Sequence, residues 1–326
     1  MEENEILFTA SEEKPKRGGI SGSTLKLVAI FTMLIDHIAA SLLEKLLSRG
    51  RAFQFMNGEG LYTVYSVMRS IGRLAFPIFC FLLVEGFIHT RNKSKYAIRL
   101  GIFALISEIP FDLAFDDKVF SWGHQNVFFT LLIGLIVMAG FELVRISEGK
   151  KWLYASAVAG VVLTGGIFVY LITFFTPYIT GSYDRNVIKG SVALIIWAIV
   201  AIFMLLVYVM VSRKKSPRET NVTFSYYAVL FAGMLLAILL HTDYGGFGVL
   251  TIAIMYILRN NKMNSIVGGC VTLTIMMYGE FPCFLDLLLI RHYNGQRGLN
   301  LKYVFYLFYP VHLFLLYLIC RFMRII

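Results

Sequence analysis

The chain of 326 residues is 58% hydrophobic and 15% charged, and its mean hydropathy is +0.71. This composition excludes an ordinary water-soluble globular fold and is typical of an integral membrane protein. The formal net charge of +10 lies in short basic clusters between apolar runs, so membrane topology explains it better than a nucleic-acid partner does.

The N-terminal segment, residues 1–23, is polar and of mixed charge. Glu2, Glu3 and Glu5 stand near its start, ahead of Lys14, Lys16 and Arg17, and a Gly/Ser run follows. Such a segment cannot bury enough apolar surface to fold, so the sequence predicts a disordered cytoplasmic tail. Its acidic start, and the long apolar run behind it, differ from a signal peptide.

The first apolar run, residues 25–47, has the length of a membrane-spanning helix and carries Asp36 and His37 near its middle. An ionisable group at the bilayer centre costs about 2.5–3.5 kcal/mol on insertion scales, so these two residues need a structural or functional reason. Lys26 precedes His37 by eleven positions. At about 100° and 1.5 Å per residue, the two side chains share one helix face about 16 Å apart.

Further membrane helices are predicted at residues 67–88, 97–115, 127–144, 152–175, 187–211, 224–240, 246–258, 264–278, 281–290 and 303–320. The predicted fold is therefore an all-α polytopic membrane helix bundle of about ten or eleven transmembrane helices. The count depends on residues 264–290, where Gly279 and Pro282 either separate two short helices or kink one long helix.

The basic residues orient the predicted bundle. A cytoplasmic N-terminus places most of the lysines and arginines of the loops in the cytoplasm, which the positive-inside rule favours. We therefore expect a multi-pass protein of the cell membrane with its N-terminus in the cytoplasm. The loop at residues 90–99 carries four cations, which either bind a cytosolic polyanion or serve topology and anionic lipids alone.

Other ionisable residues fall within the predicted helices. Arg69 and Arg73 are four apart on one face, and Glu108 and Asp112 are four apart on the next helix. We expect them to face the protein interior, either as charge pairs or as the lining of a polar cavity.

Asp36 lies about 100° around the helix from His37, so it is expected to pair with a cation such as Arg73. A carboxylate that orients His37 would come from Glu108, Asp112 or Asp243. The residues alone do not choose among these three.

The four cysteines, Cys80, Cys270, Cys283 and Cys320, lie scattered in apolar segments without CxxC or His/Cys ligand spacing. Neither a disulfide framework nor a metal site is expected, and burial in the core explains these residues best.

Six blocks of the sequence are distinctive: LKLVAIFTMLIDHI, IGRLAFPIFCFLLVEGFIHTRNKSKYAIRL, SEIPFDLAF, QNVFFTLLIGL, DYGGFGVLTI and YNGQRGLNLKYVFYLFYPVHL. Together they resemble the TraX family, membrane proteins named for N-terminal acetylation of F pilin. The resemblance spans residues 25–318.

The first half more distantly resembles the superfamily of multipass membrane acyltransferases, which includes the acyltransferase-3 proteins and lysosomal heparan-glucosaminide acetyltransferase. Acyltransferase-3 proteins carry an Arg, ten residues and then a catalytic His, and Lys26 and His37 have that spacing. The FCFLLVEGF block, the basic residues 95–99 and Pro110 also match the pattern. Two positions differ from it: Lys26 replaces the Arg, and Glu85 replaces a Ser.

The resemblance implies a membrane acyltransferase-like domain over residues 24–326 that moves an acetyl group from cytosolic acetyl-CoA to an amine or hydroxyl. The acceptor class includes a pilin-like N-terminus, another peptide, a cell-envelope glycan and a lipid-linked sugar. His37 would act as general base, with Asp36 as the second catalytic residue. The phosphates of acetyl-CoA would be held by Lys26, Arg73, Arg91, Lys93, Lys95 and Arg99.

Two other classes stay open. A transporter or flippase would use buried charges and a mid-membrane His/Asp relay, although no inverted repeat is evident. A membrane scaffold protein would make Asp36 and His37 structural.

Overall fold

The computed structural model describes residues 18–50, 57–180, 190–300 and 302–325. Within these ranges every regular element is a helix, and β-structure is limited to two isolated bridges. This confirms the predicted all-α polytopic helix bundle. Most of the expected N-terminal tail, residues 1–17, lies outside the described residues, and the first helix within the described ranges begins at Gly22.

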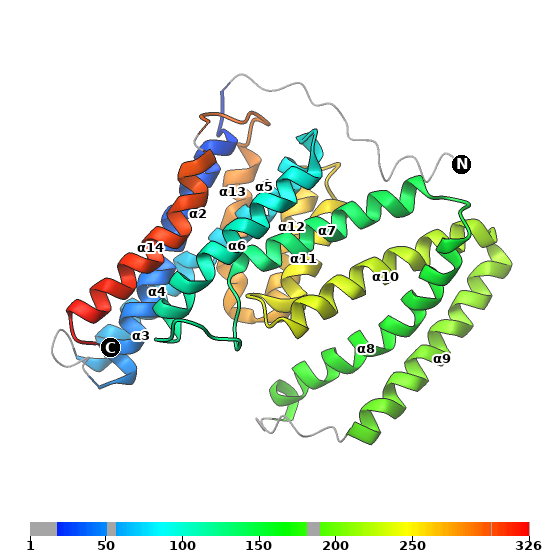
Figure 1. Ribbon diagram of the computed structural model, residues 1–326, viewed down its shortest axis with the longest axis horizontal. Coiled ribbons are helices and arrows are strands. Elements are labelled where there is room, and N and C mark those ends of the chain that lie inside the picture. The colour runs from blue at the N-terminus through cyan, green and yellow to red at the C-terminus, as the bar shows by residue number, and fades with distance from the viewer. Residues whose placement is uncertain (1–17, 51–56, 181–189, 301, 326) are drawn as a thin grey trace. The chain divides into compact units, whose positions relative to one another are not determined.

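The chain forms two compact units, Met1–Leu135 with Leu240–Ile326 and Ile136–Leu239. The helices of the first unit are α2 (Gly22–His37), η1 (Ile38–Leu43), α3 (Glu44–Ser48), α4 (Gly58–Gly72), α5 (Ala75–His89), α6 (Lys93–Phe115), the first part of α7 (Val127–Ile146), α11 (Gly245–Ile257), α12 (Lys262–Met276), η3 (Tyr278–Leu285), α13 (Asp286–Arg291) and α14 (Lys302–Phe322), labelled in Figure 1 where there is room.

The second unit contains the rest of α7 with α8 (Trp152–Thr180), α9 (Gly190–Lys214) and α10 (Pro217–Leu239). Helices α8 and α10 pack closely because Gly160 has no side chain, and a Cβ there would overlap the backbone of Phe224. Ala157 and Val161 are buried and pack in one cluster with Phe224. None of the residues in the most apolar stretch of α9 is buried within the protein, as expected for a helix that faces lipid.

Seven of the described helical segments are long and apolar enough to cross a membrane, fewer than the ten or eleven expected. Helix α6 is long, with 23 residues, but it carries several charges. Helices α11, α12 and α13 have 13, 15 and 6 residues, which is short of the roughly 20 that a full crossing requires. Residues 264–290 form separate short helices rather than one kinked helix.

Polar caps set where several of these helices begin. Ser21 accepts a hydrogen bond from the backbone N–H of Thr24 at the start of α2, and Asn92 accepts one from Lys95 at the start of α6. After His37 the α-helix widens into the π-helical segment η1. Such local insertions are rare and often occur at functional sites.

Helices α2 and α14 run in parallel (Figure 1). At their starts, the backbone N–H of Gly22 donates to the carbonyl of Gln296 at 2.8 Å. At their far ends, the guanidinium of Arg49 donates to the carbonyl of Ile325. Since α14 starts beside the start of α2, the chain finishes at the opposite end of this unit from Gly22.

Candidate functional site

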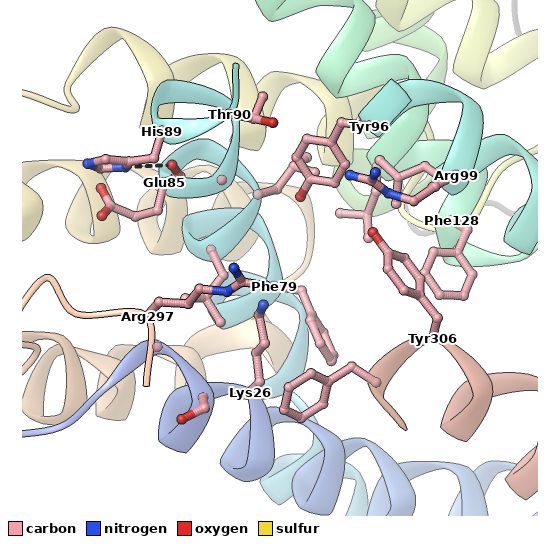
Figure 2. A pocket seen from close by; sticks show the side chains of 18 of the residues that line it. Lys26, Phe79, Glu85, His89, Thr90, Tyr96, Arg99, Phe128, Arg297 and Tyr306 are labelled. Atoms are coloured by element: carbon pink, nitrogen blue, oxygen red, sulfur yellow. Dashed lines mark hydrogen bonds between the residues drawn. The ribbon is translucent and has the colours of Figure 1, made fainter. Parts of the chain in front are cut away.

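A pocket of about 580 Å³ lies within the first unit, between α2, α5, α6, the start of α7, α14 and the loop at residues 293–300. Three cationic side chains line it, Lys26, Arg99 and Arg297, with one carboxylate, Glu85 (Figure 2). Figure 2 shows Lys26 and Arg297 close together and Arg99 beside Tyr306. The volume lies in the range typical of small-molecule sites.

The three cations of the pocket lack acidic partners among the described residues. Arg297 donates to the amide oxygen of Asn300 at 2.7 Å, and Lys26 lies over the ring of Phe305. The Nε atom of Arg99 is buried without a hydrogen-bond partner. Unpaired cations gathered in one pocket favour an anionic ligand, because their mutual repulsion falls when an anion binds.

The rest of the pocket is mostly apolar. Its walls come from Phe79, Leu82, Leu83, Leu100, Phe128 and Leu131, and Met33 and Tyr309 lie farther along α2 and α14 from the starts of these helices. A group of cations beside apolar walls suits a ligand with an anionic head and a slender, less polar arm.

His37 lies next to the pocket residues Met33 and Tyr309 without lining the pocket itself. It follows Met33 by one helical turn, on the same face of α2. Its ring contacts Tyr309, a pocket residue, with centroids 5.8 Å apart, and Phe115 at 5.5 Å. The predicted stripe therefore leads from Lys26 inside the pocket to His37 just beyond it.

The hydrogen-bond partner of His37 is a second histidine. Nδ1 of His37 lies 2.7 Å from Nε2 of His312, and the two rings are nearly parallel, with centroids 5.0 Å apart and an interplanar angle of 9°. On its other side, Nδ1 of His312 lies 2.7 Å from the carbonyl oxygen of Phe308. Sequence reasoning missed this pair, because 275 positions separate the two histidines.

The three carboxylates expected to orient His37 lie elsewhere. Glu108 accepts hydrogen bonds from the backbone and side-chain amides of Asn126. Asp112 accepts one from the backbone N–H of Ser121 at 2.8 Å. Asp243 lies 3.6 Å from His124. None of these contacts involves His37, whose hydrogen-bond partner among the described residues is His312.

Asp36 belongs to a separate ionic network. Its carboxylate accepts a hydrogen bond from Arg69 at 2.6 Å and lies 3.7 Å from Arg73, which also donates to buried Glu280 at 2.6 Å. The expected pairing of Asp36 with a cation such as Arg73 is present. Arg73, expected to hold acetyl-CoA, lies outside the pocket lining and links α2 to α4 and η3.

The basic loop contributes unequally to the pocket. Arg91 and Lys95 are exposed and absent from its lining, and Lys93 lies over the ring of Phe87 with its Nζ 4.3 Å from the ring centroid. Arg99 alone of the four expected loop cations lines the pocket. Sequence reasoning missed Arg297, whose only signal was a basic residue in the Gly-containing stretch YNGQRGLN before the last helix.

Comparison with known proteins shows which family the chain belongs to. The sequence model described as TraX protein matches residues 21–176 and 191–320. The chain is 27% identical over 306 residues to "Probable fimbrial assembly protein FimC, serogroup H1" of Dichelobacter nodosus, which covers 91% of this chain and 94% of that protein. No solved structure matches. Because the family match extends over most of the chain, this protein belongs to the TraX family.

Proposed function

We propose that this protein is a membrane-embedded acetyltransferase that moves an acetyl group from cytosolic acetyl-CoA to an amine or hydroxyl acceptor. The observation that carries the proposal is one pocket that is lined by cations without acidic partners and has a histidine in contact with its lining residue Tyr309. Membership of the TraX family supports it, because the family is named for N-terminal acetylation of F pilin.

Acetyl-CoA has an anionic part and a long, less polar part, and this pocket suits both. Its phosphates would accept charge-assisted hydrogen bonds from Lys26, Arg99 and Arg297. Its long pantetheine arm would follow the apolar wall and bring the thioester to Met33 and Tyr309. The exposed cations Arg91 and Lys95 would raise the local concentration of the polyanion outside the pocket.

His37 would act as general base at the thioester. As the acceptor nitrogen or oxygen attacks the carbonyl carbon, His37 takes the proton that the acceptor loses. A C–N or C–O bond forms, the C–S bond breaks, and the CoA thiolate leaves with that proton from His37. No oxidant or reductant is consumed.

The acceptor would be a cell-envelope molecule that reaches His37. The similarity to a fimbrial assembly protein favours a pilin-like N-terminal amine, and a cell-envelope glycan or lipid-linked sugar is the alternative with a hydroxyl. The protein would lie in the cell membrane with the cations of the pocket toward the cytosol, the compartment that supplies acetyl-CoA.

Membranes that contain the protein, incubated with radioactive acetyl-CoA, test the proposal. We expect label in a protein or glycan fraction, and a loss of at least about 100-fold in His37→Ala, since a general base typically contributes 10²–10⁴-fold. His292→Ala is the matched control, because His292 is exposed and outside the pocket lining. Full transfer by His37→Ala overturns the assignment, and substrate flux without transfer indicates a transporter.

A further inference from the structure

We infer that His312 is a positioning residue that fixes the tautomer of His37, so that the lone pair of His37 sits on Nε2. The inference rests on the proposed function for its catalytic meaning, but the hydrogen-bond pattern itself is independent of any substrate. It follows from two short contacts considered one after the other, first His312 with Phe308 and then His37 with His312.

The first contact sets the proton on His312. Its Nδ1 atom lies 2.7 Å from the carbonyl oxygen of Phe308. A carbonyl oxygen only accepts hydrogen bonds, so Nδ1 of His312 carries a proton. A neutral imidazole has one N–H, which leaves Nε2 of His312 as an acceptor.

The second contact transfers that constraint to His37. Nδ1 of His37 lies 2.7 Å from Nε2 of His312. Since Nε2 of neutral His312 accepts, Nδ1 of His37 must donate. Neutral His37 therefore has its N–H at Nδ1 and its lone pair at Nε2.

Neighbouring rings hold both imidazoles in this arrangement. Phe308 stacks on His312 with centroids 4.7 Å apart, and Tyr309 meets the edge of each histidine. Phe115 contacts His37 from α6. His312 is 5% exposed, so its hydrogen bonds face little competition from water.

The arrangement assigns His312 a role in proton transfer. When His37 takes a proton at Nε2, its Nδ1–H still donates to Nε2 of His312, which stabilises the imidazolium. In serine hydrolases a buried carboxylate performs this task for the base. Here a neutral imidazole does so without adding a buried negative charge.

Tautomers can be read directly from the protein labelled with ¹⁵N-histidine, in detergent or lipid nanodiscs, by long-range ¹H–¹⁵N correlation. We expect His37 and His312 both to carry the proton on Nδ1, with signals assigned by their loss in His37→Gln and His312→Gln. In His312→Ala, His37 should shift toward the Nε2–H tautomer that free imidazole side chains prefer. An Nε2–H tautomer of His37 in the unmodified protein overturns the inference, whether or not the variants fold.

Kinetics provide the second readout. His312→Ala should lower kcat by about 100-fold, within the usual contribution of a general base, and leave the KM for acetyl-CoA unchanged because His312 is absent from the pocket lining. His312→Gln, whose amide oxygen accepts a hydrogen bond, should recover most of the loss, whereas His292→Ala should behave as the unmodified protein.

Unchanged kcat in a folded His312→Ala variant overturns the inference. Failure of the proposed function looks different: the unmodified protein would show the expected tautomers and yet neither bind acetyl-CoA nor transfer its acetyl group.

Discussion

Asp36 and Arg69 form an ion pair of 2.6 Å that joins α2 to α4. It directs the carboxylate toward α4 and η3, whereas the adjacent His37 contacts α6 and α14. Two residues that are neighbours in sequence therefore serve different parts of the protein. We expect the Asp36–Arg69 ion pair to stabilise the protein, and the His37–His312 pair to serve the proposed chemistry.

Asp36→Asn should destabilise the protein by up to about 3 kcal/mol, because it leaves a partly buried arginine without its carboxylate. Thermal unfolding in detergent measures this. The double variant Asp36→Asn/Arg69→Gln should lose less than the sum of the two single variants, since it removes both charges together. Full stability with abolished transfer in Asp36→Asn would instead make Asp36 a catalytic residue, as the family resemblance implied.

Gly72→Ala should interfere with the packing of α4 on α2. A Cβ at position 72 would overlap the side chain of Asp36, which the ion pair with Arg69 already holds in place. We expect a lower unfolding temperature and a lower yield of inserted protein. Gly101→Ala is the matched control, because its Cβ would lie 3.6 Å from Leu132, an ordinary contact, and helix propensity would then favour alanine by up to about 1 kcal/mol. Equal behaviour of the two variants would show that α4 and α2 separate easily.

Lys26→Ala and Arg297→Ala should each weaken acetyl-CoA binding about tenfold or more, since each removes a charge-assisted hydrogen bond worth about 1.5–3 kcal/mol. Equilibrium binding to the purified protein measures this. Lys95→Ala should have a smaller effect, because Lys95 is exposed and absent from the pocket lining. Arg291→Ala, an exposed arginine outside the pocket lining, controls for net charge. Equal losses in all four variants would mean that acetyl-CoA responds to overall charge and not to this pocket.

The stability of the first unit should fall as the pH rises through neutrality. The carboxylate of Asp243, 3.6 Å from His124, raises the pKa of His124, which lies in the loop between α6 and α7. A raised pKa in the folded state stabilises the protein fully below the unfolded value of about 6.5, and this contribution disappears as the pH passes the folded pKa. Unfolding temperatures recorded between about pH 5.5 and pH 8.5 should therefore decline, and the decline should flatten in His124→Gln. An unchanged slope in that variant would assign the effect to another group.

Reporters fused at the two ends of the chain should lie on opposite sides of the membrane. Helices α2 and α14 run in parallel, so the carbonyl of Ile325 meets Arg49 at the far end of the unit from Gly22. With the basic loop in the cytoplasm, the N-terminal reporter should be cytoplasmic and the C-terminal one external. A reporter inserted at Ser216 should also be cytoplasmic. Two terminal reporters on the same side would contradict the parallel arrangement.

Composition and periodicity alone determined the features of this protein that depend on local sequence. Backbone hydrogen bonds in lipid must close within helices or barrels, and apolar runs of roughly 20 residues are the length of membrane helices, so the all-α membrane fold followed from the sequence. Helical geometry, which is local, likewise placed Lys26 and His37 on one stripe. The number of full crossings did not follow, because short apolar helices such as α11 have the same composition as spanning ones.

Only the tertiary structure decided which distant residues meet. It joined His312 to His37, brought Arg297 into the pocket with Lys26, and placed Arg73 between Asp36 and Glu280 instead of in the pocket. Each of these contacts depends on how α14, the loop before it, or η3 packs against the first helices. Residues more than 200 positions apart leave no periodic signal of such packing, because helical periodicity describes which face a residue occupies and not which helix that face meets.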